Sequence, residues 1–63
     1  MSTARPRAQL HELRRMWGRL RVTLGTEDAP LVLERKSPMG HYEVWKLVEG
    51  IGSKAWFERQ GES

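Results

Sequence analysis

The residues of this 63-residue chain best suited to binding chemistry are arginines, which crowd into its first third. Residues 1–21 hold six arginines and one glutamate, a balance of +5, whereas residues 22–63 carry a balance of −2, which together make the net charge of +3. Arginines neutralise nucleic-acid phosphates and also pair bidentately with carboxylates. Such a one-sided basic segment favours a nucleic-acid or acidic-protein partner. A solvated helix face that aids solubility explains it equally well.

Aromatic residues are the second group that could bind a partner, with three tryptophans, one tyrosine and one phenylalanine. If the C-terminal half forms a sheet, large apolar side chains fall on both of its faces, and one helix covers only one of them. An uncovered aromatic face often marks an interaction surface, which here is a dimer interface, a partner site or a platform for stacking bases. The predicted binding residues are Arg7, Arg14, Arg15, Arg19, Arg21, Trp45 and Trp56.

Residues that could support catalysis or hold a metal are scattered. Glu27 and Asp28 are adjacent in a loop, where a solvated turn explains them better than a catalytic pair. The glycines of residues 50–52 form a segment shorter than any phosphate-binding loop. His11 and His41 show no ligand spacing with the carboxylates, and the chain has no cysteine. We therefore expect no enzymatic activity, no metal and no cofactor.

The arginine-rich segment has the apolar spacing of an amphipathic helix over residues 7–24. Its apolar residues follow steps of three and four and are Leu10, Leu13, Trp17, Leu20 and Leu24. This spacing assigns Trp17 to the core. The arginines then border the apolar stripe or point further into solvent, and residues 1–6 form a flexible start. Gly18 weakens the helix.

Three strands are predicted after this helix, at about residues 31–36, 41–48 and 53–60, because these segments are rich in β-branched and aromatic residues. The predicted fold is a single α+β domain of residues 1–63, with an N-terminal basic amphipathic helix packed on a three-stranded antiparallel meander. An alternative remains open, because apolar residues spaced three apart in residues 42–51 also fit a helix. The C-terminal half would then resemble a helix-turn-helix in an all-α protein.

The short length of the chain limits the size of its core. A domain of this size buries only ~60% of the surface of its unfolded chain, and small scaffolds often add disulfides, a metal or a second subunit. Without cysteine, a homodimer or a well-packed small core remains. We expect a cytoplasmic protein without a membrane partner, because no apolar run approaches the ~18 residues of a membrane span.

Two functional hypotheses follow from these observations. The first is a small non-catalytic regulatory protein that binds nucleic acid through the basic helix face. The alternative is a protein-interaction module or inhibitor, of the kind found among bacterial and phage accessory proteins, that binds an acidic surface of a larger partner. The identity of the partner, and the choice between DNA and RNA, stay open.

Overall fold

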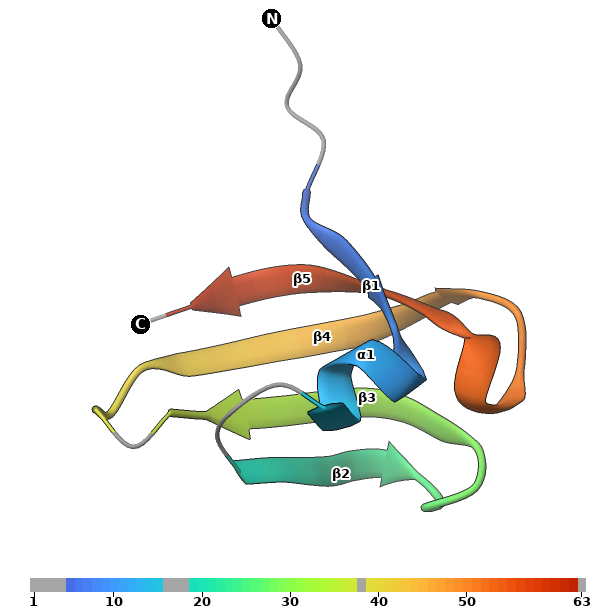
Figure 1. The fold of residues 1–63 in the computed structure, drawn as a ribbon, viewed down its shortest axis with the longest axis horizontal. Coiled ribbons are helices and arrows are strands. Elements are labelled where there is room, and N and C mark those ends of the chain that lie inside the picture. Colours follow the sequence, from blue (N-terminus) through green and yellow to red (C-terminus); the bar gives the residue numbers. More distant parts are fainter. Residues whose placement is uncertain (1–4, 16–18, 38, 63) are drawn as a thin grey trace, which may run out of the picture.

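A computed structural model of the chain, which describes residues 5–15, 19–37 and 39–62, is built mainly from one five-stranded antiparallel sheet (Figure 1). Its elements are β1 (Arg7–Gln9), α1 (Leu10–Arg15), β2 (Arg19–Gly25), β3 (Pro30–Lys36), β4 (Tyr42–Glu49), the 3-10 turn η1 (Gly52–Lys54) and β5 (Trp56–Glu62).

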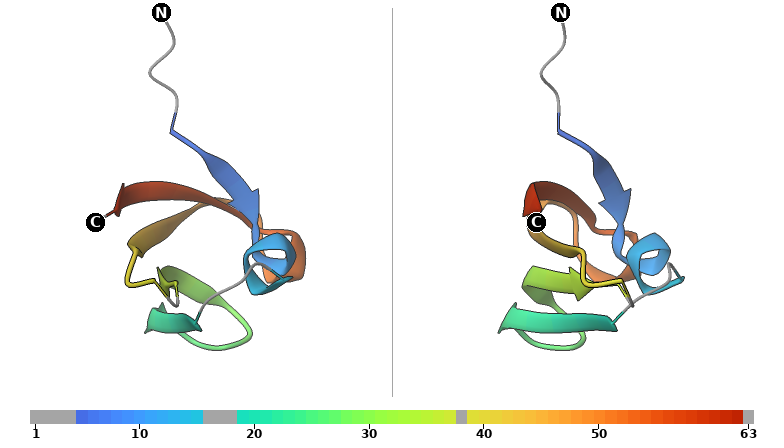
Figure 2. Two further views of the ribbon diagram at one scale, coloured as in Figure 1. Left: turned by 60° about the vertical axis from the view of Figure 1, so that its left-hand side comes forward. Right: turned by 90° about the vertical axis from the view of Figure 1, so that its left-hand side faces the viewer.

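The strands lie in the order β1-β5-β4-β3-β2. Strands β2 to β5 form a meander, and the N-terminal β1 pairs with β5, where Ala8 lies opposite Phe57. The sheet curls, and α1 closes the open side of the curl (Figure 2). Each strand therefore has an inner face toward α1 and an outer face toward solvent.

The core fills the inside of the curl. Its largest fully buried side chains come from α1, β3 and β5, and they are Leu10, Leu13, Leu33 and Phe57. Trp45 of β4 joins them at 4% exposure. Burying side chains of this size stabilises a fold by about 1.5–3 kcal/mol each, so α1 contributes chiefly by placing two leucines in the core.

The helix predicted over residues 7–24 is wrong. Of the described residues in that range, Leu10–Arg15 alone are helical, and residues 7–9 and 19–25 are strands. Residues 19–24 alternate polar and apolar, which is the period of a half-buried strand. Leu20 and Val22 turn toward the core while Arg19 and Arg21 are exposed. The apolar residues at these positions also fit the period of a helix, and this second pattern led to the wrong prediction.

The three-strand meander and the all-α alternative are overturned by the same sheet. Strand β4 pairs along both sides, with Leu33 of β3 opposite Trp45 and Phe57 of β5 opposite Leu47. Strands β3 and β4 lie within one residue of two expected strands, and β5 begins three residues later than the third. The expected contribution of Trp17 to the core, the helix-weakening role of Gly18 and the expected flexibility of residues 1–4 lie outside the described residues.

The β2–β3 hairpin depends on a glycine. Gly25 has a φ of +98°, and a Cβ added there would lie 2.6 Å from the Ala29 carbonyl oxygen. The pairing of β2 with β3 also shifts register between Val22 and Leu24. Such bulges at a sheet edge discourage pairing with further strands.

Candidate nucleic-acid interface

Cationic side chains gather on the outer face of β2, β3 and β4. Directly opposed residues of antiparallel strands share a face, and Lys36 lies opposite both Arg19 and Tyr42. Arg21 lies opposite Glu34, on the same face. Further along the sheet, Lys46 of β4 lies opposite Val32. We call the four cations Arg19, Arg21, Lys36 and Lys46 the basic outer face.

These four cations are exposed. Among the residues that the structure describes, no carboxylate lies within ion-pair distance of any of them. Other arginines are already engaged: Arg7 Nε lies 3.4 Å from a carboxylate oxygen of Glu58. Glu34 and Glu58 lie opposite Arg21 and Lys46 on this face but form no ion pair with them, so the four cations remain available to attract anions.

A hollow of about 250 Å³ opens within this surface. Residues of three strands line it, namely Arg19, Arg21, Glu34, Arg35, Lys36 and Tyr42. The half-buried Tyr42 donates a hydrogen bond from its hydroxyl to the Glu34 carboxylate. This bond fixes the direction of the tyrosine ring beside the cations.

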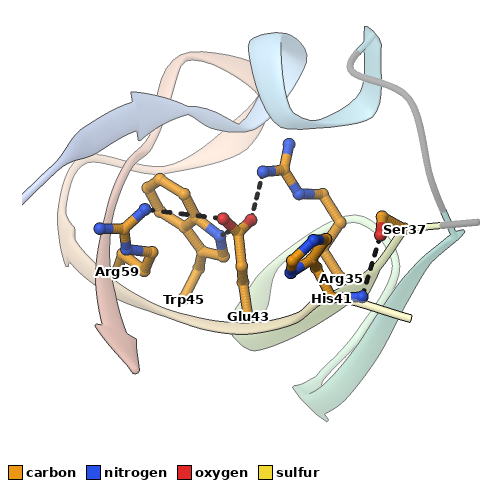
Figure 3. Close-up of polar contacts among 6 residues, drawn as sticks. All are labelled: Arg35, Ser37, His41, Glu43, Trp45 and Arg59. Carbon is orange, nitrogen blue, oxygen red and sulfur yellow. Dashed lines mark hydrogen bonds and ion pairs between the residues drawn. The ribbon is translucent and has the colours of Figure 1, made fainter. Parts of the chain in front are cut away.

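A second polar cluster lies on the inner face, where Glu43 gathers three donors (Figure 3). Arg35 donates to one carboxylate oxygen of Glu43, and Trp45 Nε1 donates to the same oxygen at 3.2 Å. Arg59 Nη1 lies 3.6 Å from the other oxygen. The Arg35 guanidinium also lies 5.9 Å from the centre of the Trp45 ring.

The Glu43 cluster has a structural role, because its side chains are largely buried. The side chains of Arg35 and Glu43 are only 6% and 15% exposed. No buried side-chain polar atom of the described residues lacks a hydrogen-bond partner. A satisfied buried network of this kind ties strands together and specifies their register; here it joins β3, β4 and β5.

The structure brings two of the seven predicted binding residues together, Arg19 and Arg21. Arg14 and Arg15 lie on α1, on the side of the molecule that closes the curl. There, Arg14 Nη2 donates to the Glu27 carbonyl oxygen at 2.6 Å, whereas Arg15 is exposed. The predicted basic helix face therefore does not exist as one surface.

The remaining predicted residues are also separated. Arg7 lies on β1 and is paired with Glu58. Trp45 is in the core, so its ring does not form part of the outer surface. Trp56 is half-buried and, because it alternates with the fully buried Phe57, belongs to the outer face near β1.

Sequence reasoning missed three residues of this surface, Lys36, Tyr42 and Lys46. Alternation within β2 would have placed Arg19 and Arg21 on one outward face. The partners from β3 and β4 follow only from the cross-strand register, which depends on contacts far apart in the sequence.

No protein-family model, curated protein or solved structure matches the chain. Within the described ranges, no three histidine or acidic side chains stand close enough to share a metal ion. No helix among the same residues has the length and apolar character needed to span a membrane. Fold and site together define a small antiparallel-sheet protein with a basic outer face.

Proposed function

We propose that this chain is a small cytoplasmic regulatory protein that binds single-stranded nucleic acid, without catalysis, on its basic outer face. The observation that carries the proposal is a set of four exposed cations that form no ion pair with any described acid, three of which, Arg19, Arg21 and Lys36, line a hollow together with Tyr42. The proposed contact site is therefore a face of the sheet and not the face of the helix predicted from the sequence.

The geometry of a sheet suits a phosphate backbone. Arg19, Lys36 and Tyr42 stand in register on three neighbouring strands, which places them about 5 Å apart from strand to strand. Arg21 lies two residues from Arg19, a step of about 7 Å along the strand. Arg19, Arg21 and Lys36 thus form a compact group at which successive phosphates find a positive partner, and Lys46 adds a fourth cation four residues beyond Tyr42 on β4.

The preference for a single strand follows from Tyr42. Proteins that bind single strands combine cations that follow the backbone with aromatic rings on which bases stack. A base in a duplex is already stacked and cannot lie on the ring. The Tyr42 ring, held by its bond to Glu34, stands next to Lys36 and is the aromatic residue that lines the hollow among those the structure describes.

Salt-dependent binding tests this proposal. We expect a fluorescently labelled oligonucleotide of ~12 nucleotides to bind at ~50 mM salt, with log affinity falling by about 0.7 per phosphate contact for each unit of log salt. Four contacts give a slope of about −3. A duplex of the same sequence should bind more weakly. Absence of binding to single-stranded DNA and RNA at ~50 mM salt would refute the proposal.

The alternative function is a protein-interaction module that binds an acidic surface. The edge position of β2 favours it, because one side of that strand pairs with no other strand of the described sheet. An extended acidic segment would pair by backbone hydrogen bonds with residues 19–22, the regular part of this edge that precedes the bulge, with its carboxylates beside Arg19 and Arg21. A Glu-rich peptide that binds while oligonucleotides do not would favour this function.

A further inference from the structure

Exposed apolar side chains gather at one end of the long axis of the molecule. Five large hydrophobic residues are exposed in the described ranges, and four of them, Leu24, Leu31, Val48 and Ile51, come from the β2–β3 and β4–β5 ends. We call these four residues the apolar end. The fifth, Met39, lies in the β3–β4 turn at the opposite end of the long axis (Figure 1).

A hollow of about 80 Å³ opens at the apolar end. Its walls are glycine and apolar residues, with Leu31, Leu47 and Ala55 among them, and no charged side chain lines it. Ile51 is one of the residues that line this hollow, yet 87% of it is exposed. The end therefore carries a projecting apolar side chain next to an apolar recess.

We propose that the chain forms a homodimer in which two copies meet at the apolar end around a two-fold axis. A two-fold contact uses the same patch on both copies, so the patch must complement itself. A projection beside a recess meets this condition, because the rotation brings Ile51 of each copy to the recess of the other. This inference does not depend on the proposed nucleic-acid binding.

The distribution of charge favours a dimer formed through the apolar end over a dimer formed through the basic outer face. The surroundings of the apolar end carry Glu27, Asp28 and Glu49 together with Lys54 and with Arg14, which reaches the Glu27 carbonyl oxygen. Both signs are therefore present, and a two-fold rotation can set acids against bases. Two basic outer faces would instead repel each other.

The size of the end sets the strength of this dimer. The molecule measures 28 × 19 Å across its long axis, so the end offers at most roughly 500 Å² to a partner. Stable interfaces bury about 800 Å² on each side. We therefore expect a weak dimer whose population rises with concentration.

Sedimentation velocity over a concentration series tests the proposal. Between ~10 μM and ~1 mM the average mass of the natural chain should rise from that of a monomer toward that of a dimer. The variant I51D places a charge at the apolar recess and should weaken association at least tenfold. M39D is the matched control, because Met39 is also 87% exposed, and its association should equal that of the natural chain.

Neither variant should unfold, because both side chains lie almost entirely in solvent, and far-UV circular dichroism checks this. A natural chain that stays monomeric at ~1 mM overturns the proposal and leaves the apolar end to a different partner. Association that persists unchanged in I51D places the contact elsewhere and overturns it as well.

Discussion

At the scale of single residues, the surroundings of an arginine matter more than its presence. Arg7, Arg14 and Arg35 each meet an acceptor in the folded chain, whereas Arg19 and Arg21 meet none among the described residues. Only cations whose charge is not already compensated have their full charge available to an incoming phosphate. Counting arginines along the sequence overestimates the binding surface for this reason.

Reversing two charges tests the contribution of β2. The double variant R19E/R21E should bind a single strand at least tenfold more weakly at ~50 mM salt, because two phosphate contacts are lost and repulsion is added. Fluorescence anisotropy with the labelled oligonucleotide measures the change. The salt slope should also fall by about 1.4, from two contacts at 0.7 each.

The matched control for this charge reversal is R15E on α1. Arg15 is exposed, like Arg19 and Arg21, but lies outside the outer face, so its reversal should lower affinity no more than about threefold through long-range charge. The single reversal R19E changes the net charge by the same amount as R15E and should lower affinity more; equal losses in the two would mean that the total charge of the chain, and not the outer face, drives binding.

Removing the carboxylate of Glu43 should destabilise the fold. In E43A the nearly buried Arg35 loses its ion pair, and truncating one partner of a buried pair costs about 3–5 kcal/mol. Urea unfolding measures the free energy of unfolding. E49A removes an exposed glutamate from the same strand and should change it by no more than about 0.5 kcal/mol. Equal stability of the two variants would show that the cluster contributes little.

At the scale of elements, glycines shape the two hairpins on either side of β3. Gly25 and Gly40 have φ of +98° and +93°, but only at Gly25 would a Cβ meet backbone atoms. G40A should cost about 1–2 kcal/mol through the left-handed conformation alone. G25A adds the clash with the Ala29 carbonyl and should cost more. Thermal unfolding measures the loss of stability in each variant. A G25A chain as stable as G40A would contradict this explanation of the β2–β3 hairpin.

The elements also show what the sequence could predict. The residue types of β3 and β4 predict strands because Val, Leu, Tyr and Trp lie between clear turns. Residues 19–24 carry the alternation of a strand, but Leu10, Leu13, Leu20 and Leu24 together also match a helix. Local periodicity cannot separate these two interpretations. Tertiary pairing of β2 with β3 decides in favour of the strand.

The binding surface was less predictable than the strands. Arg19 and Arg21 were included in the predicted site, whereas Lys36 and Tyr42 were not. Their proximity follows from the register in which Arg19, Lys36 and Tyr42 lie opposite one another. Register is set by how the core packs across strands, and no short segment of sequence contains that information.

At the scale of the whole molecule, three of the four cations of the basic outer face lie away from the apolar end, and Lys46 lies next to it, in the cross-strand row of Leu24. The basic outer face covers β2 to β4, and the apolar end lies where the β2–β3 and β4–β5 connections meet (Figure 1). A dimer formed through the apolar end would leave Arg19, Arg21 and Lys36 of both copies open. Two linked faces would hold a long single strand more tightly than one, because the second contact becomes intramolecular.

The most direct test of the central claim is to map the bound surface residue by residue. In an NMR titration of the isotope-labelled chain with a single-stranded oligonucleotide at ~50 mM salt, we predict that the largest shifts fall on Arg19, Arg21, Lys36 and Tyr42. The amides of α1 should change little. Binding whose shifts centre on α1, with the outer face unchanged, would contradict the account.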